Sequence, residues 1–173
     1  DKDGNTDGRI TSSDRVRMGY PTVPEIIYGF GPIIRYKKVD FGFLFQGAAR
    51  TSMMLSGMHP FGTNTRKNVM KWIADSHWSP DYQNIYADYP RLTQSDHANN
   101  TATSSFWLRD ASFLKLKNAE IGYTYKNMRF YLSGTNLLTF SNFKLWDPEM
   151  GGGSGLKYPT RRVFNLGFQM TIN

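Results

Sequence analysis

The stretch Arg162-Val-Phe-Asn-Leu-Gly-Phe-Gln-Met-Thr-Ile-Asn173 alternates between two kinds of residue. After Arg162, the even positions are large and apolar: Phe164, Leu166, Phe168, Met170 and Ile172. Most odd positions are polar or small. Because successive side chains of a strand point to opposite faces, this period of two predicts a strand over 162–173 with one apolar face.

Four other segments, 26–36, 39–49, 119–125 and 128–140, show the same alternation. Their apolar faces are Ile26, Tyr28, Phe30, Ile34 and Tyr36; Val39, Phe41, Phe43, Phe45 and Ala49; Ala119, Ile121, Tyr123 and Tyr125; and Met128, Phe130, Leu132, Leu138 and Phe140. Most of these segments are about twice as long as the usual 5–6 residues of a soluble strand. Roughly ten residues are needed to cross a lipid band about 25 Å tall at a tilt of about 40°.

The connections between these segments alternate between short and long. Lys37-Lys38 and Lys126-Asn127 are short turns, whereas 50–112 and 141–160 are long and rich in Gly, Pro, Ser, Asn and Trp. Outer-membrane barrels have short periplasmic turns and long extracellular loops. The sequence therefore predicts an all-β, transmembrane antiparallel β-barrel, in preference to a soluble β-sandwich. Five strands cannot close a barrel, since the smallest have about eight, so the strands belong to a larger one.

Composition agrees with this class. The chain has 173 residues, 21 Lys and Arg against 14 Asp and Glu, no Cys and 15% aromatic residues. The absence of Cys excludes a disulfide scaffold and a Cys-ligated zinc site, and no apolar run reaches the roughly 18 residues of a transmembrane helix. The net charge of +7 comes from dispersed residues, which favours a solvated or lipid-facing surface over nucleic-acid binding. No known catalytic motif is present, so we expect no enzymatic activity.

Residues 3–14 fit the calcium-loop pattern D-x-[DN]-x-[DN]-G-x-I-x-x-x-[DE]. The expected ligands are Asp3, Asn5, Asp7, the carbonyl of Arg9, Thr11 and Asp14, and Gly8 would allow the sharp turn. Calcium takes six to eight oxygen ligands, and this spacing wraps them around one point. The sequence predicts one structural Ca²⁺ ion, whereas the alternative is a turn rich in Asp, Asn and Gly without an ion.

Several motifs resemble the C-terminal part of SusC/RagA-type TonB-linked outer-membrane proteins. They are Trp107-Leu-Arg-Asp-Ala-Ser-Phe-Leu-Lys-Leu-Lys-Asn-Ala-Glu-Ile-Gly-Tyr-Thr124, Ser133-Gly-Thr-Asn-Leu-Leu-Thr-Phe140, Trp146-Asp-Pro-Glu149, His77-Trp-Ser-Pro80 and Tyr89-Pro-Arg-Leu92. Phe113, Lys115 and His77 depart from the family's usual Tyr, Arg and Arg. The resemblance covers nearly the whole chain.

The resemblance implies that the chain holds the last five strands of a 22-stranded plugged barrel, with the plug domain N-terminal to Asp1. The expected segments are an extracellular loop with the calcium motif (1–25), a strand pair (26–49), a long extracellular loop (50–112), a strand pair (113–140), an extracellular loop (141–160) and a final strand (161–173). The implied function is TonB-dependent import of an oligosaccharide, or of a peptide, across the outer membrane of a Gram-negative bacterium of the Bacteroidetes type. The implied partners are a SusD-like surface lipoprotein, TonB and outer-membrane lipid or lipopolysaccharide.

Two other functions remain open, and so do the substrate-binding residues. A passive porin or adhesin barrel would lack a plug domain, and a dockerin-like module would need a second calcium loop. Lys115 and Lys117 alternate in step with Ala119, Ile121 and Tyr123, so we expect both to point outward near the extracellular rim, either beside lipopolysaccharide phosphates or solvated above the lipid. Trp78, Trp107 and Trp146 fall within the family motifs, so we expect them to pack the loops, not to stack on sugars. Trp72 lies outside those motifs.

Overall fold

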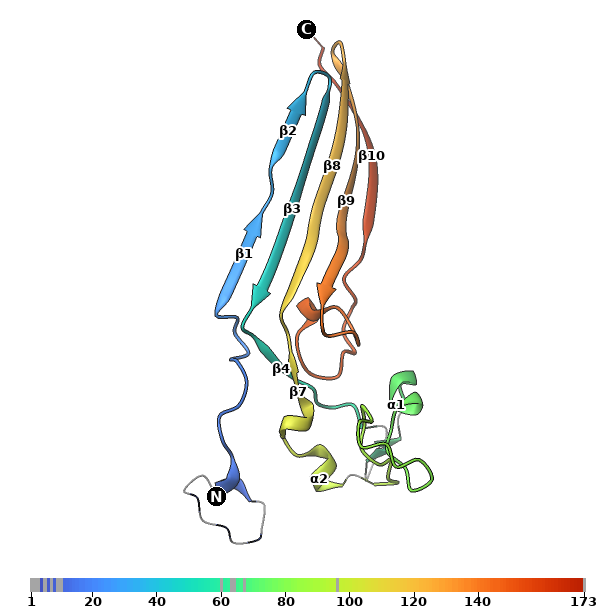
Figure 1. Cartoon of the computed structure of the whole chain (residues 1–173). Helices are drawn as coiled ribbons and strands as arrows, with labels where there is room; N and C mark the ends of the chain where they lie inside the picture. The colour runs from blue at the N-terminus through green and yellow to red at the C-terminus, as the bar shows by residue number, and fades with distance from the viewer. Residues whose placement is uncertain are drawn as a thin grey trace.

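The computed structural model describes residues 4, 6, 8, 11–59, 61–62, 65–66, 68–95 and 97–172. Its main feature is a tall antiparallel sheet with a smaller layer of loops at one end (Figure 1). The sheet contains β1 (Ile26–Phe30), β2 (Ile33–Tyr36), β3 (Val39–Ala49), β8 (Phe113–Tyr125), β9 (Met128–Ser141) and β10 (Val163–Met170). The strand order is β1-β3-β8-β9-β10, with β2 also paired to β3. Each of the segments with alternating residues is therefore confirmed as β-structure.

The predicted strand over 26–36 is interrupted at Gly31-Pro32, and β1 and β2 lie on either side. Proline has no amide hydrogen to donate to a neighbouring strand, but its carbonyl still accepts from the Phe43 amide at 3.4 Å. A Cβ atom at Gly31 would lie 2.1 Å from the Phe43 carbonyl oxygen, so only glycine fits there. Both strands keep one continuous register with β3, from Ile26 opposite Ala49 to Tyr36 opposite Val39.

The two short turns lie together at the end of the sheet opposite the loops (Figure 1). Lys37 and Lys126 adopt φ values of +53° and +52° there. The Thr124 amide donates to the Lys38 carbonyl at 2.7 Å and thereby joins the two hairpins. The prediction that the short and long connections lie at opposite ends is confirmed.

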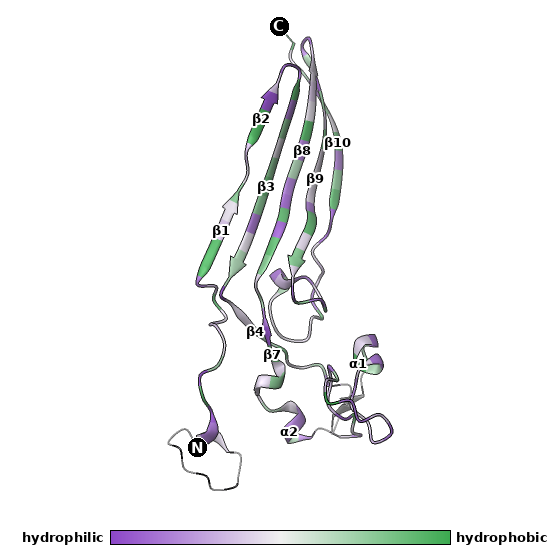
Figure 2. Cartoon of the chain, in the orientation of Figure 1, coloured by the Kyte–Doolittle hydropathy of each residue, from purple (hydrophilic) through white to green (hydrophobic). Residues whose placement is uncertain are grey.

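The sheet has one apolar and one polar face, and Figure 2 shows green and purple positions alternating along the strands. Facing residues on paired strands share a face, so Phe41, Ile121, Leu132 and Leu166 lie together. All four are exposed, and Leu166 is 85% exposed. Nothing in the described part of the chain covers this apolar face.

The loop layer has its own hydrophobic core. The secondary-structure elements outside the tall sheet are β4 (Ser52–Met54), β5 (Phe61–Gly62), β6 (Thr65–Arg66), α1 (Lys71–Asp75), α2 (Ala98–Thr101), β7 (Leu108–Asp110) and the 3₁₀ turns Ser12–Asp14, Ser105–Trp107 and Pro148–Met150. The core residues are Met53, Leu55, Met58, Ile73, Tyr89, Trp107, Ala111 and Phe143, and Trp72 and Trp146 pack against them. Trp107 is buried and donates its indole N–H to the Asn100 carbonyl at 3.0 Å. None of the helices in the described residues is long and apolar enough to cross a membrane.

Candidate functional site

The predicted calcium loop lies mostly outside the described residues. Asp3, Asn5, Asp7 and Arg9 are not described, so the ligand set stays a prediction. Gly8 is described and has φ of +73°, the left-handed conformation that the motif's turn requires. In the described residues no group of three or more acidic or His side chains could hold a metal ion.

The last two predicted ligands form a capping box around a single 3₁₀ turn. The Thr11 amide donates to Asp14 Oδ2 at 2.5 Å, and the Ser13 amide donates to Thr11 Oγ1 at 3.2 Å. These bonds fix Asp14 relative to Thr11, which orders the C-terminal part of the motif.

A β-bulge in β8 changes which face Lys115 occupies. Leu116 pairs with Phe45 and Asn118 pairs with Leu44, so Lys117 is an extra residue between two adjacent positions of β3. An extra residue reverses the alternation beyond it. The prediction that Lys115 shares the outward face of Ala119 is therefore wrong.

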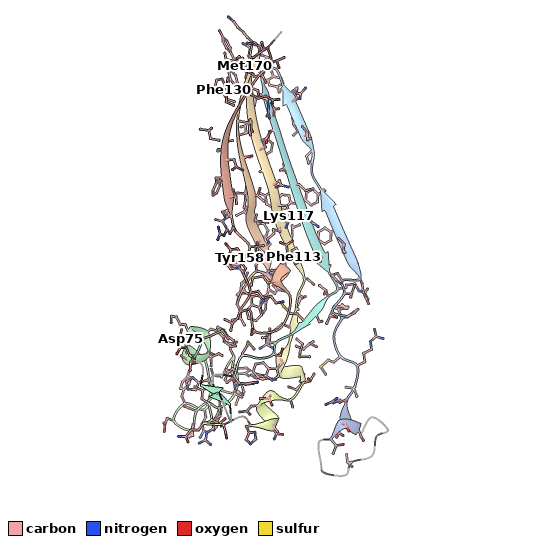
Figure 3. The ribbon with its side chains drawn as sticks, turned by 180° about the vertical axis from the view of Figure 1, so that it is seen from behind. Asp75, Phe113, Lys117, Phe130, Tyr158 and Met170 are labelled. Atoms are coloured by element: carbon pink, nitrogen blue, oxygen red, sulfur yellow. The ribbon has the colours of Figure 1, made fainter. Side chains whose placement is uncertain are left out.

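Lys115 instead turns to the polar face and is fully buried. Its Nζ contacts Asp147 Oδ2 and Glu149 Oε2, both at 2.5 Å. Lys117 reaches the same carboxylate, with its Nζ 2.8 Å from Glu149 Oε1. Neither lysine points outward as expected, and Figure 3 shows Lys117 in the half of the sheet nearer the loops. We call these four residues the Lys115 cluster.

The Lys115 cluster fastens the segment 141–160 to the polar face of the sheet. Burial raises the pKa of the Asp147 carboxyl, but hydrogen bonds from Lys115 and Thr160 outweigh that effect and hold the pKa below its ordinary value. Burial also opposes ionisation of Glu149, and hydrogen bonds from Lys115 and Lys117 again lower the pKa overall. Both carboxylates are therefore ionised at neutral pH, and the four charges balance.

A second charged group lies on the same face, toward the turns. Arg129 Nη2 is 2.7 Å from Glu120 Oε1, and Arg129 Nε donates to Asp40 Oδ1 at 3.1 Å. The guanidinium also lies over the Tyr131 ring, 5.1 Å from its centroid. Charged side chains on three adjacent strands fit an aqueous or protein-filled interior better than lipid.

A cavity of about 530 Å³ opens on the polar face at the loop end. Its lining includes Ile27, Gln46, Ala48, Phe113, Pro148 and Glu149. Two hydroxyl groups in the wall already make hydrogen bonds, since Thr51 donates to the Thr22 carbonyl and Ser52 accepts from the Tyr20 amide. The cavity is mostly apolar and falls in the size range of ligand pockets.

The Lys115 cluster, the Arg129 ion pairs and the cavity were not predicted from the sequence, although the charged residues themselves stand in recognisable positions. Lys115 and Lys117 stand within one quoted motif and Asp147 and Glu149 within another, but no local pattern connects the two motifs. Asp40, Glu120 and Arg129 occupy the polar positions of three successive strands near their turns. Their shared position near the turns could have predicted that these three charged side chains meet on the polar face.

Long antiparallel strands with a lipid-compatible face and a charged face define a wall segment of an outer-membrane-type β-barrel. Comparison with known proteins supports this class. The chain is 33% identical over 194 residues to TonB-dependent receptor P26 of Formosa agariphila, covering 98% of this chain and 19% of that protein. It is 25% identical over 180 residues to TonB-dependent receptor SusC of Bacteroides thetaiotaomicron, covering 97% and 17%.

Similarity to a solved structure supports the same class of protein. The structure of the RagAB peptide importer in the closed-closed state matches with a TM-score of 0.72 at 26% identity, covering 98% of this chain and 20% of that chain. No family model matches. The chain is a homologue of SusC/RagA-type TonB-dependent receptors and spans about a fifth of the length of the curated relatives it matches.

Proposed function

We propose that this chain is a barrel segment of a TonB-dependent transporter in the outer membrane of a Gram-negative bacterium of the Bacteroidetes type. The observation that carries the proposal is the two-faced sheet: an apolar surface suited to lipid and an opposite surface with the Lys115 cluster, the Arg129 ion pairs and the cavity. In the described residues β10 pairs only with β9, and β1 only with β3. Further strands of the same protein would complete both edges, because a barrel in lipid cannot have an open edge.

In this proposal the turns at Lys37-Lys38 and Lys126-Asn127 are periplasmic and the loop layer is extracellular. The polar face lines the lumen, where a plug domain would reside. The cargo is a large nutrient, either an oligosaccharide or a peptide. We prefer an oligosaccharide because of the family resemblance of the sequence motifs, although the similar RagAB structure is described as that of a peptide importer.

We further propose that a SusD-like surface lipoprotein contacts segments 50–112 and 141–160, and that TonB acts from the periplasm. Exposed aromatic side chains on these segments support a contact surface, with Tyr82, Tyr86 and Tyr158 at 68%, 86% and 70% exposure. Figure 3 labels Tyr158 at the end of the sheet nearer the loops.

The test is to purify the full-length protein from native membranes and identify its partners and domains by mass spectrometry. A co-purifying lipoprotein and an N-terminal plug domain are expected. Uptake of labelled oligosaccharides and peptides should require TonB. Finding neither a lipoprotein nor a plug domain would refute the proposal and favour a passive barrel.

We also propose one structural Ca²⁺ ion held by Asp3, Asn5, Asp7, the Arg9 carbonyl, Thr11 and Asp14. Oxygen donors at this spacing suit Ca²⁺ better than Mg²⁺, which keeps several waters. The left-handed Gly8 supports the proposal, because the calcium-loop pattern needs its sharp turn at this position.

A further inference from the structure

Three lysines gather around two tyrosines at the turn end of the sheet. Lys37 Nζ lies 5.3 Å from the centroid of the Tyr36 ring. Lys38 Nζ and Lys126 Nζ lie 5.4 Å and 5.6 Å from the centroid of the Tyr125 ring. Lys38 belongs to one hairpin and Tyr125 to the next, so the group bridges two hairpins. We call these five residues the turn-end lysine group.

This group carries positive charge that the described part of the chain does not neutralise. All three lysines are exposed, and none has an ion pair with a carboxylate among the described residues. Lys38 and Lys126 repel each other across the single ring that they share. An anion between the ammonium groups would relieve that repulsion.

The tyrosines place the group at the edge of the lipid-facing surface. Tyr36 pairs with Val39 and Tyr125 pairs with Met128, so both rings lie on the apolar face. Tyrosine rings are enriched where hydrocarbon meets head groups in membrane barrels. The ammonium groups therefore lie at the depth of lipid phosphates.

An apolar hollow begins next to the lysines on the same face. It has a volume of about 320 Å³, and its lining includes Val39, Ile121, Tyr123, Phe130, Leu132 and Leu166. Val39 directly follows Lys38, and Tyr123 lies opposite Val39 in the sheet. Figure 3 shows Phe130 and Met170 at this end of the sheet. The hollow runs from the head-group level toward the middle of the strands.

We propose that this surface binds one anionic glycerophospholipid, with its phosphate among Lys37, Lys38 and Lys126 and an acyl chain in the hollow. Two independent features support this occupant: ammonium groups at head-group depth that have no ion pair among the described residues, and an apolar hollow whose lining begins at Val39, the residue after Lys38. The inference rests on the placement of the apolar face in lipid, but not on which nutrient is imported.

The test uses the full-length protein in mild detergent and native mass spectrometry with defined lipids. We expect dioleoyl-phosphatidylglycerol to bind at least tenfold more tightly than dioleoyl-phosphatidylcholine, whose acyl chains are identical. The triple variant Lys37→Asn, Lys38→Gln, Lys126→Asn should lose this preference. Asn is chosen at the two positive-φ positions because it tolerates that conformation.

The matched control removes three exposed charges from the loops: Arg15→Gln, Arg17→Gln and Lys144→Gln. It should keep the preference for phosphatidylglycerol. Ile121→Trp, which fills the hollow without a change in charge, should weaken binding of both lipids.

Three outcomes would overturn the proposal. Equal binding of the two lipids by the wild-type protein would overturn it, and this measurement does not depend on a variant that folds. The control could lose as much binding as the triple variant, which would indicate diffuse electrostatics. Binding of lipid A alone, or of a periplasmic protein in place of phosphatidylglycerol, would assign the lysines to a different partner.

Discussion

Replacement of Lys115 by Met tests the role of the Lys115 cluster. The Lys115 side chain is 1% exposed, whereas its partners Asp147 and Glu149 are 19% and 22% exposed. Removing one member of a buried pair costs about 3–5 kcal/mol, because a charge is left without a partner. Here Lys117 still contacts Glu149 and Thr160 still contacts Asp147. Partial exposure and these remaining contacts reduce the expected cost to about 2–3 kcal/mol.

The cost should appear as local opening of segment 141–160, because the strands keep their own hydrogen bonds. Hydrogen–deuterium exchange of the full-length protein measures it directly. The Met150 amide donates to the Asp147 carbonyl and the Gly153 amide donates to the Met54 carbonyl, both at 2.9 Å. These two amides should exchange about 30- to 150-fold faster, at tenfold per 1.4 kcal/mol. Exchange in β9 should not change.

Two other variants complete the experiment. Lys117→Met should have a smaller effect, because Glu149 keeps the buried Lys115. Lys144→Met removes an exposed lysine of the same segment and should have none. Unchanged exchange in Lys115→Met, or equal acceleration in Lys144→Met, would show that the cluster does not hold the segment.

Acid should release the same segment. The pKa values of Asp147 and Glu149 lie below their ordinary 3.8 and 4.5, so their stabilisation is complete at neutral pH, declines as pH falls through these ordinary values and is lost below the lowered pKa values; a fall in protection from exchange already between pH 7 and 5 would contradict this. In the calcium loop, Asp7→Ala should lower bound calcium, measured by elemental analysis after dialysis, from about one ion per chain to none without unfolding the strands, whereas Asp81→Ala, at an exposed acid elsewhere, should bind as the wild type does. Gly152→Ala should also speed exchange at Gly153, because the new Cβ would lie 2.5 Å from the Met54 carbonyl oxygen; wild-type exchange would show that the backbone adjusts freely.

The strands were predictable because their alternation directly reflects the two different environments on either side of a sheet. The prediction failed at Lys115, where Leu-Lys-Leu-Lys alternates without interruption. The bulge at Lys117 arises in the pairing with β3, and pairing between distant segments leaves no mark in the local pattern. The break between β1 and β2 was different, because Pro32 was a visible signal.

The loop layer could not be predicted in detail because its core is assembled from residues far apart in the sequence. Tyr89 and Trp107 lie with ring centroids 5.6 Å apart, and His59 contacts both rings. The family motifs indicated only that Trp107 packs within the loops, which the structure confirms. The charged residues of the Lys115 cluster likewise meet only after the chain folds.

The short two-stranded sheet formed by β4 and β7, here called the neck, has a consequence for how the surface of the loop layer can evolve. Three residue pairs, from Ser52 opposite Asp110 to Met54 opposite Leu108, join the long loop to the barrel wall. Beyond that neck the long loop shares a core with Phe143 and Trp146 of segment 141–160, and its most exposed large hydrophobic side chains in the described residues are Tyr82, Ile85 and Tyr86. In the proposed topology, insertions or substitutions at this tip would alter the surface that the protein presents to the cell exterior. They would leave the register of the strands in the tall sheet unchanged.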